Sequence, residues 1–128
     1  MATPLESIAP DRFRVAPHHL LNSQWMLLAA GDFARGRWNA MTVAWGSFGT
    51  MWGLPFAQVV VRPQRYPRQL MDAFYTFTLT AFPKAFRAAL ETMGSRSGRQ
   101  GDKAAAAGLT PVAATQVAAP VFREAELA

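Results

Sequence analysis

The sequence predicts a mainly β fold, a small β-barrel with inserted helices, built as one domain. Three observations favour this class. The chain has 128 residues, which is the size of a single domain. Short apolar or alternating runs indicate four or five strands. One or two helices are expected, and they come late in the chain instead of alternating with the strands. This order does not give regular βαβ units.

The N-terminal part is expected to form a leader and then a β-hairpin. Residues 1–20 are Pro-rich and lack a clear period, so we assign the domain itself to residues 21–128. The apolar run QWMLLAA (24–30) predicts a buried strand, and the following GDFARG supplies turn residues. The stretch NAMTVAWGSFGTMW (39–52) completes the hairpin.

The middle of the chain predicts further strands and a first helix. QVVV (58–61) is β-branched and continuous, which predicts a buried strand that ends at the following Arg-Pro pair. Residues 67–74 predict a short helix, because Pro67 suits a first helical turn. TFTLTA (76–81) alternates threonine with apolar residues, as a strand with one buried face does.

The last third predicts two helices and a final strand. KAFRAALETMG (84–94) has the apolar spacing of an amphipathic helix, with Gly94 as its C-terminal stop. Asp102 is the expected N-cap of a short alanine-rich helix that ends at Gly108. Residues 120–127 predict the beginning of a last strand.

Composition excludes several classes of protein. The chain has no cysteine, which excludes disulfides, thiol catalysis and cysteine-type metal sites. It has no apolar run of 18 residues and no signal-peptide pattern, so we expect a cytoplasmic protein without a membrane partner. The adjacent His18 and His19 point to opposite faces of a strand and lack a nearby carboxylate, so no metal site is predicted.

Positive charge is concentrated in one third of the sequence. The segment from Arg62 to Lys103 has eight basic and three acidic residues, whereas the rest of the chain has five of each. A cluster of this kind attracts anions. The alternative is that it forms only a soluble basic surface.

Three stretches combine residues that could carry chemistry. NAMTVAWGSFGTMWG (39–53) mixes glycines with tryptophans. Either the glycines let a flat ligand approach the backbone, or the aromatic side chains are simply part of the hydrophobic core. VRPQRYPRQ (61–69) has arginines three residues apart. These arginines could bind phosphate oxygens, or they could be solvated side chains of a connection between a strand and a helix. MGSRSGRQGDK (93–103) has the glycines, hydroxyls and cations of an anion-binding loop, although such loops are common.

These blocks, in this order, resemble the flavin reductase-like, flavoredoxin-type family of FMN-binding split barrels. The family pattern is matched by NAMTVAWG, MWGLP, VVVRPQRYP, YTFTLT, GSRSGRQGDK and GLTP, which cover residue 21 to the C-terminal end. The resemblance implies an FMN cofactor, a split barrel and a homodimer with FMN at its interface. It also implies NADH or NADPH as co-substrate.

The resemblance implies three groups of cofactor-binding residues and no catalytic triad. Asn39, Met41 and Thr42 are expected against the flavin ring. The ribityl and phosphate side is expected to be lined by Arg62, Gln64, Arg65 and Tyr66. The residues expected to close over the phosphate are Ser95, Ser97, Gly98, Arg99 and Lys103.

The chain departs from the family pattern at four places. Pro67 replaces a threonine, which removes a hydroxyl and an N–H donor. Gln100 and Tyr75 each replace an aspartate. Family members continue beyond the strand at which this chain stops, Ala128. We therefore expect a barrel that is C-terminally truncated, either incomplete or completed by a partner chain.

The resulting hypothesis is an FMN-binding oxidoreductase of the flavin reductase type, which passes electrons from NAD(P)H through FMN to an acceptor. In such a flavoprotein the cofactor performs the chemistry, and the protein binds and orients it. The alternative is a non-catalytic or degenerate flavin-binding module of the same fold. A nucleic-acid-binding barrel is disfavoured, because the arginines form two tight groups instead of a stripe.

Overall fold

The fold is built on a three-stranded antiparallel sheet, and a computed structural model describes residues 4–95 and 102–128 of the chain. The order of strands in this main sheet is β2-β1-β5. Their bounds are Met26–Asp32 for β1, Arg37–Val43 for β2 and Phe77–Thr80 for β5. Two smaller sheets pair β3 (Gly46–Met51) with β4 (Leu54–Val59) and β6 (Pro111–Val112) with β7 (Val121–Phe122).

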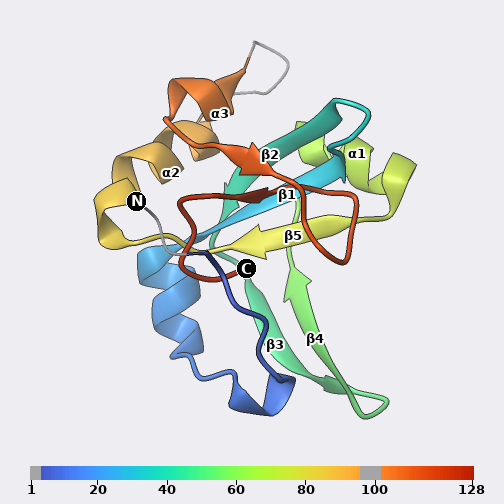
Figure 1. The fold of residues 1–128 in the computed structure, drawn as a ribbon, viewed down its shortest axis with the longest axis vertical. Coiled ribbons are helices and arrows are strands. Elements are labelled where there is room, and N and C mark those ends of the chain that lie inside the picture. Colours follow the sequence, from blue (N-terminus) through green and yellow to red (C-terminus); the bar gives the residue numbers. More distant parts are fainter. Residues whose placement is uncertain (1–3, 96–101) are drawn as a thin grey trace.

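The described residues also form three α-helices and three shorter helical segments. The α-helices are α1 (Tyr66–Phe74), α2 (Arg87–Ser95) and α3 (Lys103–Ala106). A π-helical segment, η2 (His19–Gln24), precedes β1, and 3-10 turns lie at η1 (Pro10–Arg12) and η3 (Lys84–Phe86). Figure 1 shows the β3–β4 hairpin extending away from the main sheet and its helices.

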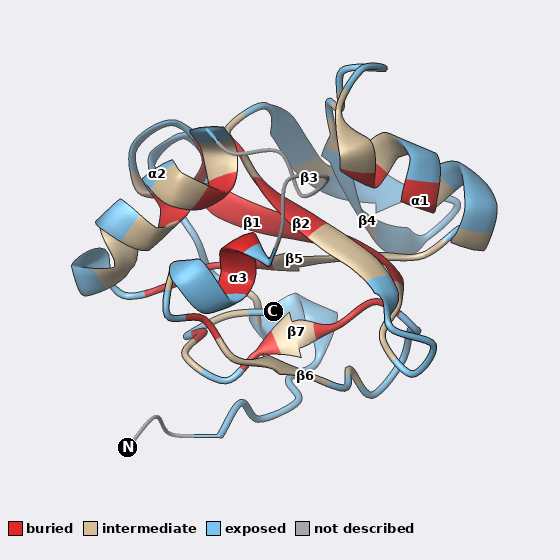
Figure 2. Ribbon diagram, turned by 90° about the horizontal axis from the view of Figure 1, so that it is seen from above, coloured by how far each residue is buried: buried red, intermediate tan, exposed pale blue. Residues whose placement is uncertain are grey.

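Strand β1 is buried on both faces, and this explains its continuous apolar sequence. Leu27 packs in one hydrophobic cluster with Leu90 of α2, whereas Leu28 packs in a second cluster with Leu70 of α1. Successive residues of a strand point to opposite faces, so α1 and α2 cover opposite sides of the main sheet. The buried residues run along β1 and β2 through the middle of the molecule (Figure 2).

The structure confirms the elements that had strong local signals. β1 and β2 form the predicted hairpin, α1 covers the predicted 67–74, and β5 lies within the predicted 76–81. The Asp102 carboxylate caps α3 by accepting a hydrogen bond from the N–H of Ala105, with 3.1 Å between the two heavy atoms. Gly108 follows the helix with a positive φ of 76°, as a C-terminal glycine should.

Two predictions about the middle of the chain are wrong. The stretch 39–52 is not one strand, because it leaves the main sheet after Val43 and enters the separate β3–β4 hairpin. QVVV (58–61) is not buried, and Val60 is 51% exposed. β4 pairs with β3, away from the main sheet, and Val59 and Val61 are only partly buried, where they pack against the core cluster under α1.

Strand β5 and the ends of two other elements also differ from prediction. The threonine face of β5 is covered as well, since Thr80 is buried and its hydroxyl donates to the Leu27 carbonyl at 3.3 Å. Helix α2 does not stop at Gly94 but includes it and Ser95. The expected last strand over 120–127 is reduced to two paired residues.

The described strands do not close into a barrel, because they form three separate sheets. This is a split, sheet-rich architecture with helices on both faces of its largest sheet. Within 4–95 and 102–128, every helix is too short or too polar to cross a lipid bilayer.

The β1–β2 hairpin offers a matched pair of glycines for testing this packing. Gly31 has φ +110°, and a Cβ there would lie 2.1 Å from the Arg37 carbonyl oxygen. Gly36 has φ +67° and open space around it. Gly31→Ala should lower the free energy of unfolding by about 3 kcal/mol, and Gly36→Ala by about 1 kcal/mol, in urea denaturation. Equal losses would contradict the close backbone contact.

Candidate functional site

Two cationic side chains from distant parts of the sequence, Arg65 and Lys103, meet at the last turn of α2, and Thr42 bonds to α2 about one turn earlier. The Thr42 hydroxyl of β2 donates a hydrogen bond to the Leu90 carbonyl oxygen at 2.5 Å. The Arg65 guanidinium donates to the Gly94 carbonyl at 3.3 Å, and the Lys103 ammonium donates to the Met93 carbonyl at 3.1 Å. The sequence predicted that all three of these residues bind the cofactor.

Helix geometry explains why these donors gather at this turn. The last four carbonyl groups of an α-helix have no partner within the helix, and this end carries partial negative charge. Arg65 and Lys103 satisfy two such carbonyls with cationic donors. Gly94 lets β2 approach closely, since a Cβ there would lie 3.2 Å from the Cβ of Thr42.

The two cations lie in a setting where charge is poorly screened by water. Lys103 is 4% exposed, and burial, with a smaller contribution from the nearby Arg65, lowers its pKa to about 8. Arg65 is half-buried at the N-cap of α1. No carboxylate of the described residues forms an ion pair with Arg65. We call Arg65 and Lys103 the cation pair.

The neighbouring residues of the arginine-rich stretch point elsewhere. Arg62 is exposed and stacks over the Trp45 ring, with 5.4 Å from Cζ to the ring centroid. Gln64 is exposed, and Tyr66 packs against the core cluster beneath α1. Arg68 pairs with Asp72 at 3.1 Å. Of the three arginines spaced three apart, only Arg65 therefore reaches α2.

The residues expected against a ring are divided between the faces of β2. Met41 is buried in the cluster under α1, and Asn39 lies on the same face by strand alternation. Thr42 lies on the opposite face, against α2. The Oδ1 atom of Asn39 is buried without a hydrogen-bond partner in the described part of the molecule. Such an atom can accept a hydrogen bond from a bound molecule.

The glycine-rich loop is only partly within the described structure. Ser95 is exposed, and its hydroxyl donates to the Thr92 carbonyl at 3.5 Å. Ser97, Gly98 and Arg99 lie outside the described residues. Among the residues that the structure describes, no group of three His, Asp or Glu side chains is placed to hold a metal ion.

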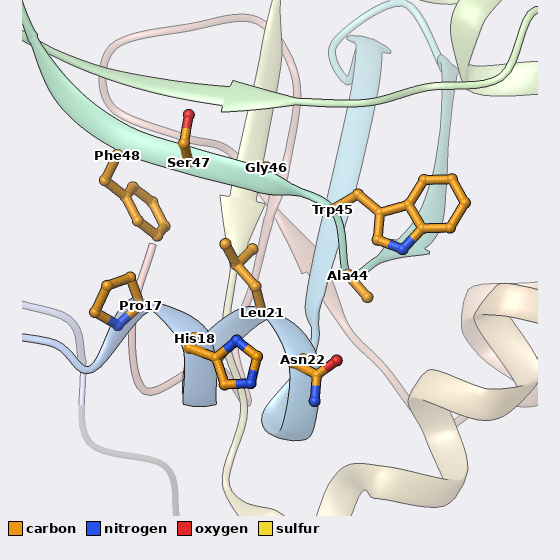
Figure 3. Close-up of a pocket in the computed structure, with 9 residues that line it drawn as sticks. All are labelled: Pro17, His18, Leu21, Asn22, Ala44, Trp45, Gly46, Ser47 and Phe48. Carbon is orange, nitrogen blue, oxygen red and sulfur yellow. The ribbon is translucent and has the colours of Figure 1, made fainter.

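A pocket of about 390 Å³ lies between η2 and the beginning of β3 (Figure 3). Pro17, His18, Leu21 and Asn22 line it from the N-terminal segment, and residues 44–48 line it from the connection of β2 to β3. Sequence reasoning missed the N-terminal half, because that segment has no periodic pattern and His18 was considered only as a metal ligand. This segment meets β3 only in the folded chain, so no local sequence pattern marks the contact.

Solved structures of flavin proteins share this fold. The flavoredoxin of Desulfovibrio vulgaris (Miyazaki F) matches 78% of this chain with 29% identity and a TM-score of 0.70. An FMN-binding domain of flavin reductase-like enzyme from Shewanella baltica matches 86% with 19% identity and a TM-score of 0.71. The 2-nitrobenzoate 2-nitroreductase NbaA of Pseudomonas fluorescens matches 94% with 15% identity and a TM-score of 0.62.

The chain therefore has the split-barrel fold that these flavin proteins share. The resemblance to the flavoredoxin-type family predicted from the sequence is confirmed. The chain spans 54% of the length of flavoredoxin and 56% of the Shewanella baltica domain. No family model matches the sequence, and no curated protein is significantly similar to it.

The buried Lys103 should make stability depend on pH in a defined direction. Its pKa is about 8 in the folded protein instead of 10.5, so the unfolded chain binds more protons between these values. Stability should therefore rise with pH in this window. Relative to Lys103→Met, the parent should gain free energy of unfolding from pH 8 to pH 10, measured by urea denaturation. A difference that does not change with pH would contradict the burial of a charged lysine.

Proposed function

We propose that this protein binds FMN and acts as an oxidoreductase of the flavin reductase type. Electrons would pass from NADH or NADPH through FMN to an acceptor. One observation carries this proposal: Arg65 and Lys103, from separate segments, converge beside the end of α2, where Lys103 is buried and Arg65 is half-buried. A fold shared with flavin proteins supports the same conclusion.

The residues present fit the phosphate end of FMN. An arginine fork and an ammonium group are the donors that bind phosphate oxygens most strongly. The cation pair has its charges close together, and a phosphate dianion between them would relieve their repulsion. Ser95, the last residue of α2, would add its hydroxyl to the phosphate site.

Other residues of the chain would position and shield the cofactor. When bound, FMN supplies hydride and single-electron chemistry, so the protein needs no acid–base triad of its own. Thr42 ties β2 to α2 and fixes the distance between the sheet and the cation pair. The unpartnered oxygen of Asn39 would accept one hydrogen bond from the cofactor.

The exposed hairpin supports a homodimer as the working form. Met51, Trp52 and Leu54 at its tip are 60%, 94% and 67% exposed. An isolated two-stranded hairpin is marginally stable in water, and exposed apolar side chains of this size favour association. We propose that a second copy covers this hairpin. Light scattering on the purified chain should then give the mass of a dimer.

Arg65 and Arg68 form a matched pair for testing the phosphate site. Arg65→Ala should weaken FMN binding by about 10- to 100-fold, since it removes a charge-assisted hydrogen bond. Arg68→Ala should leave FMN affinity unchanged, because its guanidinium is paired with Asp72 at 3.1 Å. Flavin fluorescence titrations measure both affinities. Equal affinities in the two variants would refute the assignment of the phosphate to Arg65.

Turnover is tested separately from binding. Oxidation of NADH and NADPH, followed by absorbance with added FMN, should exceed the rate without protein. FMN binding without turnover would instead identify a non-catalytic flavin-binding module of this fold.

A further inference from the structure

Two exposed arginines stack on aromatic rings beside α1. The Arg37 guanidinium lies over the Phe74 ring, with 5.1 Å from Cζ to the ring centroid. The Arg62 guanidinium lies over the Trp45 ring at 5.4 Å. Stacking occupies the flat face of a guanidinium and leaves the N–H groups at its edge available for other partners.

A third stacked arginine shows how such an edge is used in a structural role. Arg87 also stacks on a ring, but its guanidinium donates a hydrogen bond to the Ser23 carbonyl and pairs with Glu91 at 3.9 Å. Arg37 and Arg62 differ from it, because within 4–95 and 102–128 neither side chain donates a hydrogen bond or forms an ion pair. The edges of these two guanidinium groups are therefore open to a molecule from outside the chain.

The two open arginines lie at opposite ends of α1. Arg62 belongs to the turn before the helix, where its carbonyl accepts a hydrogen bond from the N–H of Arg65, the N-cap, at 3.1 Å. Arg37 lies against Phe74, the last residue of α1. A helix of 9 residues is about 13 Å long. One small anion therefore cannot bind both arginines, whereas an elongated partner can.

The chemistry of this surface favours carboxylates of a polypeptide. The edge of a guanidinium matches a carboxylate in a two-point hydrogen-bonded pair. An extended chain rises about 3.3 Å per residue, so a segment of about six residues reaches both arginines. Between the two ends, α1 presents the pair of Arg68 and Asp72, and the Asp72 side chain is 65% exposed. A continuous row of phosphates would meet this carboxylate, whereas a protein can place a neutral or basic side chain opposite it.

We propose that α1 is a docking surface for an acidic segment of a partner protein, whose carboxylates bind Arg37 and Arg62. Ring stacking holds both guanidinium groups in place before the partner arrives, so less side-chain freedom is lost on binding. The proposal goes beyond the proposed function, because the contact requires no FMN.

Binding of fluorescein-labelled hexaglutamate, followed by fluorescence anisotropy at low ionic strength without FMN, tests this surface. Arg37→Gln combined with Arg62→Gln should weaken hexaglutamate binding at least about tenfold, and each single substitution about threefold. The matched control combines Arg12→Gln with Arg14→Gln, two exposed arginines of the N-terminal segment, and removes the same net charge. It should bind hexaglutamate within about twofold of the parent. Circular dichroism checks that each variant is folded.

Four outcomes would overturn the proposal. The folded parent would not bind hexaglutamate, or the control would lose as much affinity as the Arg37 and Arg62 variant, which would indicate attraction by net charge alone. One single substitution would account for the whole loss, or labelled hexathymidylate would bind the parent more tightly than hexaglutamate, which would indicate a nucleic acid. None of these results bears on the flavin titrations, so the proposed function is judged separately.

Discussion

The unpaired carbonyl groups at the end of α2 are the constraint on which the site depends. A helix that ends beside a sheet needs donors for these carbonyls, and here Arg65 and Lys103 provide them for Gly94 and Met93. The Thr42 hydroxyl adds a hydrogen bond to the Leu90 carbonyl, one turn earlier. The same contacts bring two cations into a poorly hydrated place, which lowers the pKa of Lys103 to about 8. The contacts that satisfy the helix end therefore also build the anion site that we propose.

Local sequence signals predicted much of the fold because their causes are local. The cap at Asp102 needs only its own side chain and the next three residues, and the β1–β2 hairpin needs only its turn and two apolar strands. The burial of 58–61 could not be predicted in this way. A β-branched run shows that a strand forms, but its burial depends on what packs against it, and only Val59 and Val61 of this run pack against the core, each partly buried.

The sequence predicted which charged residues belong to the candidate site better than it predicted how the residues of the site are arranged. Clustered basic residues and a family resemblance indicated Arg65 and Lys103, and the structure brings both to α2. Met41 and Thr42 are neighbours in the sequence motif, but their side chains point to opposite faces of β2. The motif alone does not reveal this. The N-terminal wall of the pocket has no sequence signal, since η2 meets β3 only through the tertiary fold.

The cation pair and the pocket that Trp45 lines differ in charge. The proposed phosphate site has two cations, whereas no lysine or arginine lines the pocket. Arg62 lies between them, with its side chain on Trp45 and its backbone hydrogen-bonded to Arg65. A change in this connecting segment would alter the cation pair and the pocket together.

A crystal structure of the protein with FMN tests the central claim most directly. Phosphate oxygens are expected within hydrogen-bonding distance of Arg65 and Lys103. Well-ordered FMN whose phosphate contacts neither cation would contradict it.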